Sequence, residues 1–322
     1  MNNSNNKQIT LNKSFQRIGL IAIMMIATHN NFLYAQYGQS MGAQSSIYIY
    51  QPEKFKFSTS LLSMTFLQGA YNATLLRHKD VSATWAAVLN ANALTQPYNV
   101  PPFNYTGTES VSAGFFTSTA ATTDITDWVL VEIRDPVTPS ILVTRKAAFI
   151  REDGRIVYLD GVSDLSFSTL SSGNYHIVIR HRNHLAIRTA SPVTINSTAC
   201  AATTQNVDFS AAQANAFQNP AVTTNTAMKD FGGGKFGMWG ANGNKDGQVR
   251  ATGPLASNDY LFLISTTLGG NVATILSNVY SSADLNMDGS VRATGIPAQN
   301  DYIFLINTVL GGDVSKIFTQ HQ

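Results

Sequence analysis

Residues 128–133 have the sequence WVLVEI, an unbroken run of aromatic, β-branched and other large side chains. Successive side chains of a β-strand point to opposite faces, so every second residue of this run can face a core. Residues 175–180, YHIVIR, repeat the pattern. Both stretches therefore predict strands within a β-sheet.

Five more runs rich in β-branched and aromatic residues lie at 47–50, 63–67, 141–150, 155–159 and 185–195, with turn residues between them. Seven short strands in one domain are typical of a β-sandwich of the immunoglobulin or fibronectin type III kind. The sequence therefore predicts a mainly β sandwich in the N-terminal part of the chain.

Three local patterns add detail to this prediction. The Asp-Gly pair at 153–154, between two apolar runs, predicts a tight hairpin. Apolar residues at helical spacing over 82–94, with Asp80 or Ser82 as N-cap, predict a helix across one end of the sandwich. Tyr175 follows a Gly-Asn turn as in a tyrosine corner, so its hydroxyl is expected to bond to the backbone a few residues upstream.

The beginning of the chain, residues 1–35, follows the pattern of an export signal. It contains three basic residues and no acidic one, and these are followed by the apolar run 18–27. This run is too short for the roughly 20 residues of a membrane-spanning helix, and no later segment reaches that length, whereas it suits a signal peptide. We expect cleavage after Ala35, no membrane span, and an exported protein that is extracellular or on the cell surface. A buried N-terminal helix is the alternative.

The composition argues against nucleic acid as a partner. The chain has 21 basic and 19 acidic residues, and loss of the leader would leave 18 basic residues against 19 acidic ones. Such a nearly neutral chain lacks the basic surface that phosphate backbones require. The single cysteine, Cys200, cannot form an intramolecular disulfide, so packing and bound ions must stabilise the exported protein.

Residues 196–235 are rich in Ser, Thr, Ala, Gln and Asn and include three consecutive glycines near their end. This composition is typical of a linker. The predicted organisation is a signal peptide at 1–35, a β-sandwich domain at 36–195, a linker at 196–235 and a small α-helical domain at 236–322.

The C-terminal part repeats itself at a period of 42 residues. Residues 242–253 read NGNKDGQVRATG, and residues 284–295 read DLNMDGSVRATG. In both copies an Asn-Asp-Tyr triplet and an apolar helical pattern follow. Such self-similarity indicates a duplication, which defines the second domain.

The spacing within each copy is that of an EF-hand-type calcium loop. Oxygen ligands at positions 1, 3 and 5 converge on one Ca²⁺, a glycine at position 6 makes the sharp turn, and position 7 contributes its backbone carbonyl. Position 12, usually a carboxylate, is a glycine in both copies, but an Asp lies six residues further on. We therefore predict an enlarged loop that this Asp closes. The predicted ligands are Asn242, Asn244, Asp246, Gln248 and Asp259 in the first site and Asp284, Asn286, Asp288, Ser290 and Asp301 in the second.

Two further expectations concern these loops. Val249 and Val291, at position 8, are expected to pair the two loops back to back. The first loop has two predicted carboxylate ligands and the second has three, so the two calcium sites should differ in affinity. A pair of metal-free turns is the alternative, because clusters of Asn, Asp and Gly form turns unaided.

Residues 236–322 resemble the dockerin type I domain, a duplicated calcium loop and helix that binds a cohesin in cellulosomes. The resemblance implies a small α fold, two Ca²⁺ ions and a cohesin-like partner. The lengthened loop departs from that family, and it lies where the residues that contact cohesin should be.

The whole mature chain resembles a group of exported proteins of Bacteroidetes and related bacteria that are labelled haemagglutinin-like. This resemblance rests on residues 66–72 (FLQGAYN), 96–99 (QPYN), 105–109 (YTGTE), 127–135 (DWVLVEIRD) and 180–185 (RHRNHL). It implies an exported, surface-associated protein and brings no catalytic residues with it.

His181 and His184, with the arginines beside them, form the densest polar cluster of the first domain. Within one strand their spacing puts the two rings on opposite faces, which favours a structural role over a metal pair. Neither Glu132, on an alternating strand, nor Glu152, in a hairpin turn, suits the acid-base pair of a glycosidase, and no nucleophile elbow occurs.

The sequence thus favours a non-catalytic, calcium-binding interaction or adhesion protein whose partner is an extracellular protein or glycan. The alternative is a polysaccharide-degrading enzyme, or its accessory subunit, that carries a dockerin-like module.

Overall fold

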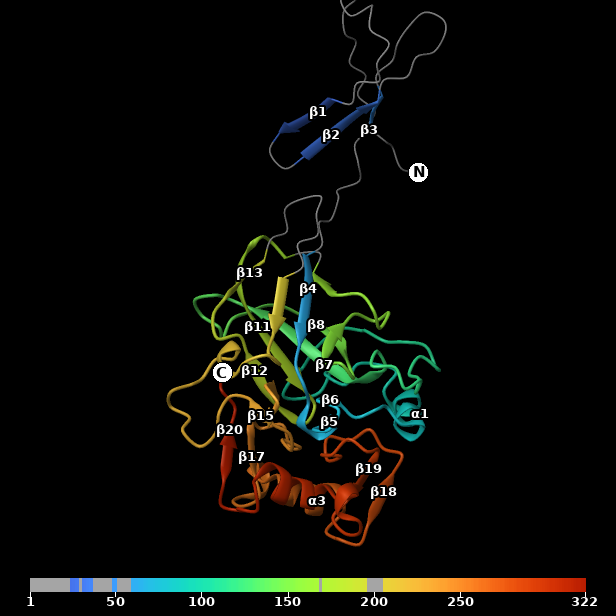
Figure 1. Ribbon diagram of the computed structural model, residues 1–322, viewed down its shortest axis with the longest axis vertical. Helices are drawn as coiled ribbons and strands as arrows, with labels where there is room; N and C mark the ends of the chain where they lie inside the picture. Colours follow the sequence, from blue (N-terminus) through green and yellow to red (C-terminus); the bar gives the residue numbers. More distant parts are fainter. Residues whose placement is uncertain (1–23, 29–30, 37–47, 51–58, 168–169, 196–204) are drawn as a thin grey trace, which may run out of the picture. The chain divides into compact units, whose positions relative to one another are not determined.

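The computed structural model divides into two compact units, Met1–Lys56 and Phe57–Gln322 (Figure 1). It describes residues 24–28, 31–36, 48–50, 59–167, 170–195 and 205–322. In the first unit, β1 (Met24–Thr28), β2 (Asn31–Gln36) and β3 (Tyr48–Tyr50) form an antiparallel sheet in that order. Most of the expected leader, including its basic residues, lies outside the described residues, so the leader stays a prediction.

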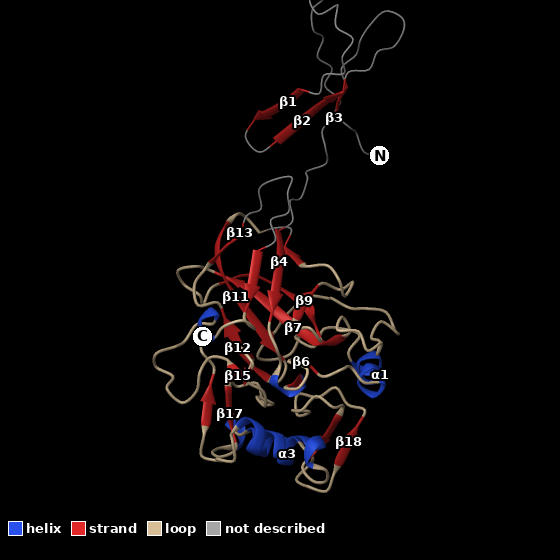
Figure 2. Ribbon diagram, viewed as in Figure 1, coloured by secondary structure: helices blue, strands red, loops and turns tan. Residues whose placement is uncertain are grey.

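The second unit is mainly β, with a large, mostly antiparallel sheet and a few small helices (Figure 2). The order of strands in this sheet is β10-β4-β9-β8-β7-β11-β12, with β13 paired to β11 and β14 paired to β4. These strands are β4 (Thr59–Met64), β7 (Ile125–Arg134), β8 (Leu142–Arg151), β9 (Arg155–Val157), β10 (Leu165–Phe167), β11 (Gly173–His181), β12 (His184–Arg188), β13 (Val193–Ile195) and β14 (Gln205–Asp208). The finer prediction of a sandwich goes beyond this description and stays a prediction.

Smaller elements complete the description of the sheet unit. The helix α1 covers Ala83–Asn92, and the two-residue strands β5 (Tyr71–Asn72) and β6 (Arg77–His78) pair with each other. Single helical turns lie at Gln68–Ala70, Gln213–Asn215, Leu255–Ser257 and Pro297–Gln299. Among the described residues, no helix is long and apolar enough to cross a membrane.

Strand β7 lies inside the sheet and is covered on both faces. Residues 128–131 and Ile133 are fully buried. The indole Nε1 of Trp128 donates to the carbonyl of Ala93, and the hydroxyl of Tyr98 donates to the carbonyl of Trp128, each at 2.7 Å. The segment after α1 therefore packs on this strand. Burial on both faces explains why residues 128–131 are all apolar.

The local patterns behave as the sequence predicts. The Ser82 side chain accepts a hydrogen bond from the Trp85 amide at 3.0 Å, which caps α1. Strands β8 and β9 form a hairpin around the Asp-Gly turn at 153–154. The Tyr175 hydroxyl donates to the Ser171 carbonyl at 3.1 Å, as in a tyrosine corner.

The expected linker, 196–235, is folded where the structure describes it. Strand β14 pairs in parallel with β4, and Val207 and Phe209 are buried in the core. A hairpin of β15 (Lys229–Gly232) and β16 (Lys235–Gly237) follows. These apolar residues thus add to the core, although they are scattered through a polar segment and show no periodic pattern in the sequence. Residues 196–204, with Cys200, lie outside the described part, and the domain boundary stays a prediction.

The two repeats have the same order of elements. In the first, β17 (Gln248–Arg250) leads to α2 (Asp259–Leu261), whose helix continues over Phe262–Thr267, and then to β18 (Ile275–Ser277). In the second, β19 (Ser290–Arg292) leads to α3 (Asp301–Ile303), continued over Phe304–Val309, and then to β20 (Ile317–Thr319). Figure 1 shows the repeats, in orange and red, at one end of the unit beside β5 and β6.

The expected pairing of Val249 with Val291 is wrong. Val249 pairs with Phe318 of β20, and Val291 pairs with Leu276 of β18. A Gly-Gly turn with positive φ follows each helix and reverses the chain. Each loop therefore pairs with the strand that follows the helix of the other repeat. Each repeat thus contributes a strand to the two-stranded sheet of the other.

Candidate metal centre

The second loop wraps its backbone around the carboxylate of Asp284. This side chain is fully buried, and its two oxygens accept hydrogen bonds from the amides of Asp288 (3.0 Å) and Gly289 (2.9 Å). Gly289, at position 6, has a φ of +87°, a left-handed conformation that glycine adopts at little cost. The half-buried Asp288 carboxylate accepts from the Ser290 amide at 2.9 Å. Positions 1, 5, 6 and 7 thus form one tight turn.

The helix α3 brings Asp301 into the same loop. Its carboxylate is buried and accepts hydrogen bonds from the amides of Leu285 (2.7 Å) and Arg292 (2.9 Å). These amides belong to positions 2 and 9 of the loop. Because Asp301 is the first residue of the helix, its carboxylate joins the loop to the helix, as a closing ligand must.

The first loop is closed by the Asp at its helix start in the same way. The buried Asp259 carboxylate accepts from the Arg250 amide at 3.0 Å, and Asn244 Oδ1 accepts from the Asp246 amide at 3.1 Å. The exposed Asp246 carboxylate in turn accepts from the Gln248 amide at 2.8 Å. The inserted residues therefore leave the Asp at the helix start within reach of the loop in both copies.

One predicted ligand in each loop has a buried oxygen without a partner. Within the described part of the chain, no hydrogen bond reaches Asn242 Oδ1 or Asn286 Oδ1. The two residues are 4% and 7% exposed, and they occupy positions 1 and 3 of their loops. A buried acceptor left unpaired costs about 1–3 kcal/mol, and a bound cation would satisfy it. The donor set therefore fits a hard, oxygen-seeking cation.

At the buried carboxylates of both loops, the effect of burial outweighs that of nearby positive charge. Burial raises the pKa of Asp259 to about 8 and that of Asp284 to about 6, and it raises the pKa of Asp301 well above its usual range. Loss of hydration disfavours the charged carboxylate, whereas a nearby divalent cation would favour it. A cation in each loop would thus remove this penalty.

Acidic side chains alone do not form either predicted calcium site. In the part of the chain that the structure describes, no three His, Cys, Asp or Glu side chains gather in the manner of a metal site. Each predicted calcium shell depends instead on amide, hydroxyl and backbone oxygens besides its acids, which suits a cation that takes 6–8 oxygen ligands.

Comparison with known proteins assigns no family. No protein-family model, no curated protein and no solved structure matches this chain. The residues of the loops and of their surroundings are therefore the basis of the functional proposal.

The hairpin formed by β11 and β12 joins both predicted calcium loops to the sheet through Asn183. This residue is fully buried. Its side-chain Nδ2 donates to the carbonyl of Asp284 at 2.8 Å, and its own carbonyl accepts from the amide of Asn242 at 3.0 Å. Asn183 therefore contacts position 1 of each loop. The sequence did not single out Asn183.

The expectation that His181 and His184 lie on opposite faces is wrong. Their Nδ1 atoms are 2.9 Å apart, because the chain turns at Arg182 and Asn183 and makes the two histidines cross-strand partners. The buried Asp127 accepts hydrogen bonds from His181 Nε2 and Arg182 Nε, both at 3.1 Å. Burial alone would raise the pKa of Asp127, but Arg182 and His181 hold it at about 2. This polar network supports the turn that carries Asn183.

Lys79 is a cation beside the second loop that the sequence did not single out. Its Nζ donates to the carbonyl of Asn286 at 2.7 Å. Burial lowers its pKa, and the carboxylates of the second loop oppose that shift. Lys79 lies between β6 and α1, so it is a second link between the loop and the sheet.

Proposed function

We propose that the chain is an exported, non-catalytic interaction protein in which a β-sandwich and a dockerin-like pair of loops bind a protein or glycan partner, with one Ca²⁺ in each loop. The observation that carries the proposal is the pair of buried, unpartnered oxygens of Asn242 and Asn286, at ligand positions of a duplicated loop. Buried carboxylates at both loop closures support it, because they need a positive charge.

Each ion would be held by the oxygens of its own loop. The residues proposed as ligands are Asn242, Asn244, Asp246, Gln248 and Asp259 for the first ion and Asp284, Asn286, Asp288, Ser290 and Asp301 for the second. The ion supplies positive charge and fixes the loop to the start of its helix. Since Asn183 contacts position 1 of both loops, the same ions would stabilise the contact between the repeats and the sheet.

Calorimetric titration of the full chain with CaCl₂ tests this proposal. We expect two Ca²⁺ ions per chain and a lower melting temperature in chelator, because a ligand that binds only the folded state stabilises it. Asn242→Ala should weaken one site, and Asn99→Ala, a change at an exposed residue outside the loops, should weaken neither. If Ca²⁺ gives no binding heat and chelator leaves the melting temperature unchanged, the calcium sites do not exist.

The enzyme alternative stays a prediction, and it has its own test. Incubation of the protein with polysaccharides, followed by measurement of new reducing ends, would reveal hydrolysis. Glu132 and Glu152 are buried and paired with arginines, Glu132 with Arg134 at 2.5 Å and Glu152 with Arg77 at 2.7 Å. Such pairing favours a structural role for both carboxylates over acid-base chemistry.

A further inference from the structure

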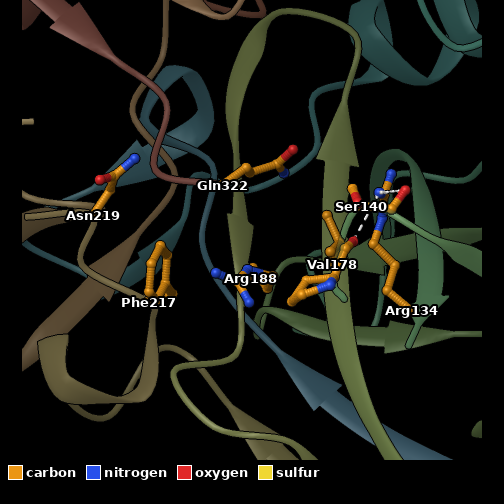
Figure 3. Close-up of a pocket in the computed structure, with 8 residues that line it drawn as sticks. Arg134, Ser140, Val178, Arg188, Phe217, Asn219 and Gln322 are labelled. Carbon is orange, nitrogen blue, oxygen red and sulfur yellow. Dashed lines mark hydrogen bonds between the residues drawn. The ribbon is translucent and has the colours of Figure 1, made fainter. Parts of the chain in front are cut away.

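A cavity of about 500 Å³ lies over the sheet and away from the predicted calcium ligands (Figure 3). Parts of the chain that are distant in sequence form it. Strand β7 contributes Arg134, the connection from β7 to β8 contributes Ser140, and β12 contributes Arg188. Phe217, Asn219 and Gln322 line it from two other segments. Backbone hydrogen bonds such as Phe217 N to Arg188 O, at 2.8 Å, hold these segments in place.

Arg188 is the unusual residue of this cavity. It is only 7% exposed, yet its Nε has no hydrogen-bond partner and its guanidinium forms no ion pair with any described residue. Its guanidinium carbon lies 4.0 Å from the centre of the Phe217 ring, and this cation–π contact holds the group in position. Figure 3 shows the guanidinium inside the cavity, between Phe217 and Val178. A buried cation without a counter-charge is costly, which indicates a missing anion.

Among the described residues, no acidic side chain at the cavity supplies that anion. Arg188, Val178 and Glu132 are successive cross-strand partners, so their side chains share one face of the sheet. Glu132 is already bound by Arg134 at 2.5 Å and by Arg180 at 2.9 Å. The cavity is lined by two arginines and no acidic side chain. Burial, with the nearby Arg134, lowers the pKa of Arg188, which agrees with this excess of positive charge.

We propose that this cavity binds the carboxylate of an acidic sugar unit, such as a uronic acid residue of a polysaccharide. The free guanidinium of Arg188 matches a carboxylate, which it can bind through two parallel hydrogen bonds. Ser140, Asn219 and Gln322 also line the cavity, and hydroxyl and amide groups such as theirs suit sugar hydroxyl groups. The volume lies within the range of small-molecule sites and accommodates a monosaccharide.

This inference specifies a ligand for the interaction role proposed above and rests on that role, but the cavity uses none of the predicted calcium ligands. Calorimetry of the full chain with galacturonate and glucuronate oligosaccharides, in Ca²⁺ and in chelator, therefore separates the two proposals. If the calcium titration succeeds and no acidic oligosaccharide binds, only the sugar site is overturned. If acidic oligosaccharides bind but Ca²⁺ does not, only the calcium sites are overturned.

The controls identify the chemistry of the ligand. We expect the acidic oligosaccharides to bind at least about tenfold more tightly than their neutral or methyl-esterified counterparts, because only the acid pairs with Arg188. Equal binding of acidic and neutral sugars would overturn the inference. Equally tight binding of acetate or inorganic phosphate would also overturn it, since the cavity would then hold a small anion only.

Variants test the residue itself. Arg188→Gln should weaken the acidic oligosaccharide at least about tenfold, because a charge-assisted pair is lost. Arg155→Gln, which removes an arginine paired with Asp164 elsewhere on the sheet, should leave affinity within about twofold. If Arg188→Gln binds as the unmodified chain does, the site is wrong. If that variant does not fold, the comparison of acidic with esterified sugars on the unmodified chain still decides the outcome.

Discussion

Replacement of Asn183 by alanine is the most direct test of how the loops are joined to the sheet. Asn183 is fully buried at the turn between β11 and β12. Alanine removes the hydrogen bond from Nδ2 to the Asp284 carbonyl, at 2.8 Å, and the one between Oδ1 and the His184 ring, at 2.7 Å. The backbone bond from the Asn242 amide to the carbonyl of residue 183 remains, so the loss falls on the second loop.

The expected cost follows from the groups left unpaired. Each buried polar group that loses its partner costs about 1–3 kcal/mol, so the two groups together predict a loss of about 2–6 kcal/mol in the free energy of unfolding. Because about 1 kcal/mol corresponds to roughly 2–4 °C in a domain of this size, the melting temperature should fall by about 4–24 °C. The calcium affinity of the second site should fall too, since Asp284 occupies its first position.

Urea unfolding of the full chain, with Ca²⁺ and with chelator, measures this cost. Asn174→Ala is the matched control, because Asn174 is exposed on β11, the strand that leads to the turn at Asn183. We expect the control to change stability by less than about 1 kcal/mol. If Asn183→Ala is no more destabilised than Asn174→Ala in either buffer, the contact between hairpin and loops does not stabilise the protein.

The remaining predictions concern the loops. Asp301→Asn should weaken the second calcium site at least about tenfold in calorimetry, and an unchanged affinity would mean that another residue closes the loop. Asp288→Ala should abolish the tighter site and Asp246→Ala the weaker one, because the second loop has more carboxylates; the opposite order would refute the charge argument. In chelator, the urea midpoint should fall as the pH rises from about 5 to 8. Burial raises the pKa of Asp259 to about 8, so the folded chain keeps a proton that the unfolded chain has already released. Filling the first site at pH 7 should therefore release about one proton, measurable in buffers of different ionisation enthalpy.

Features that depend on neighbouring residues were predictable from the sequence. The cap at Ser82, the Asp-Gly hairpin at 153–154 and the hydroxyl bond of Tyr175 each involve residues within a few positions of one another. Side-chain geometry and turn preferences are sufficient to predict such features. The positions of Asp259 and Asp301 at the helix starts were predictable for a similar reason, because the duplication repeats their spacing.

Pairings between distant residues had no comparable signal. The contact of Val249 with Phe318 depends on the direction that the chain takes after the Gly-Gly turns. Val249 and Val291 could each pair equally well with any neighbouring strand. Phe217 lies in a polar segment whose composition is typical of a linker, yet it holds the guanidinium of Arg188. A single aromatic residue among amides and small residues has no period from which its burial could be inferred.

The two histidines show how a correct rule gave a wrong geometry. Alternation of side chains holds only within one strand, and the sequence HRNH at 181–184 spans the end of one strand, a turn and the start of the next. A usable signal was present, because Asn is favoured in turns and apolar runs flank these four residues on both sides. With the turn placed there, Asn183 lies at the tip of a hairpin, the position from which it contacts Asp284. A polar residue that is buried at the tip of a hairpin needs partners outside that hairpin, and here those partners are the first positions of both predicted calcium loops.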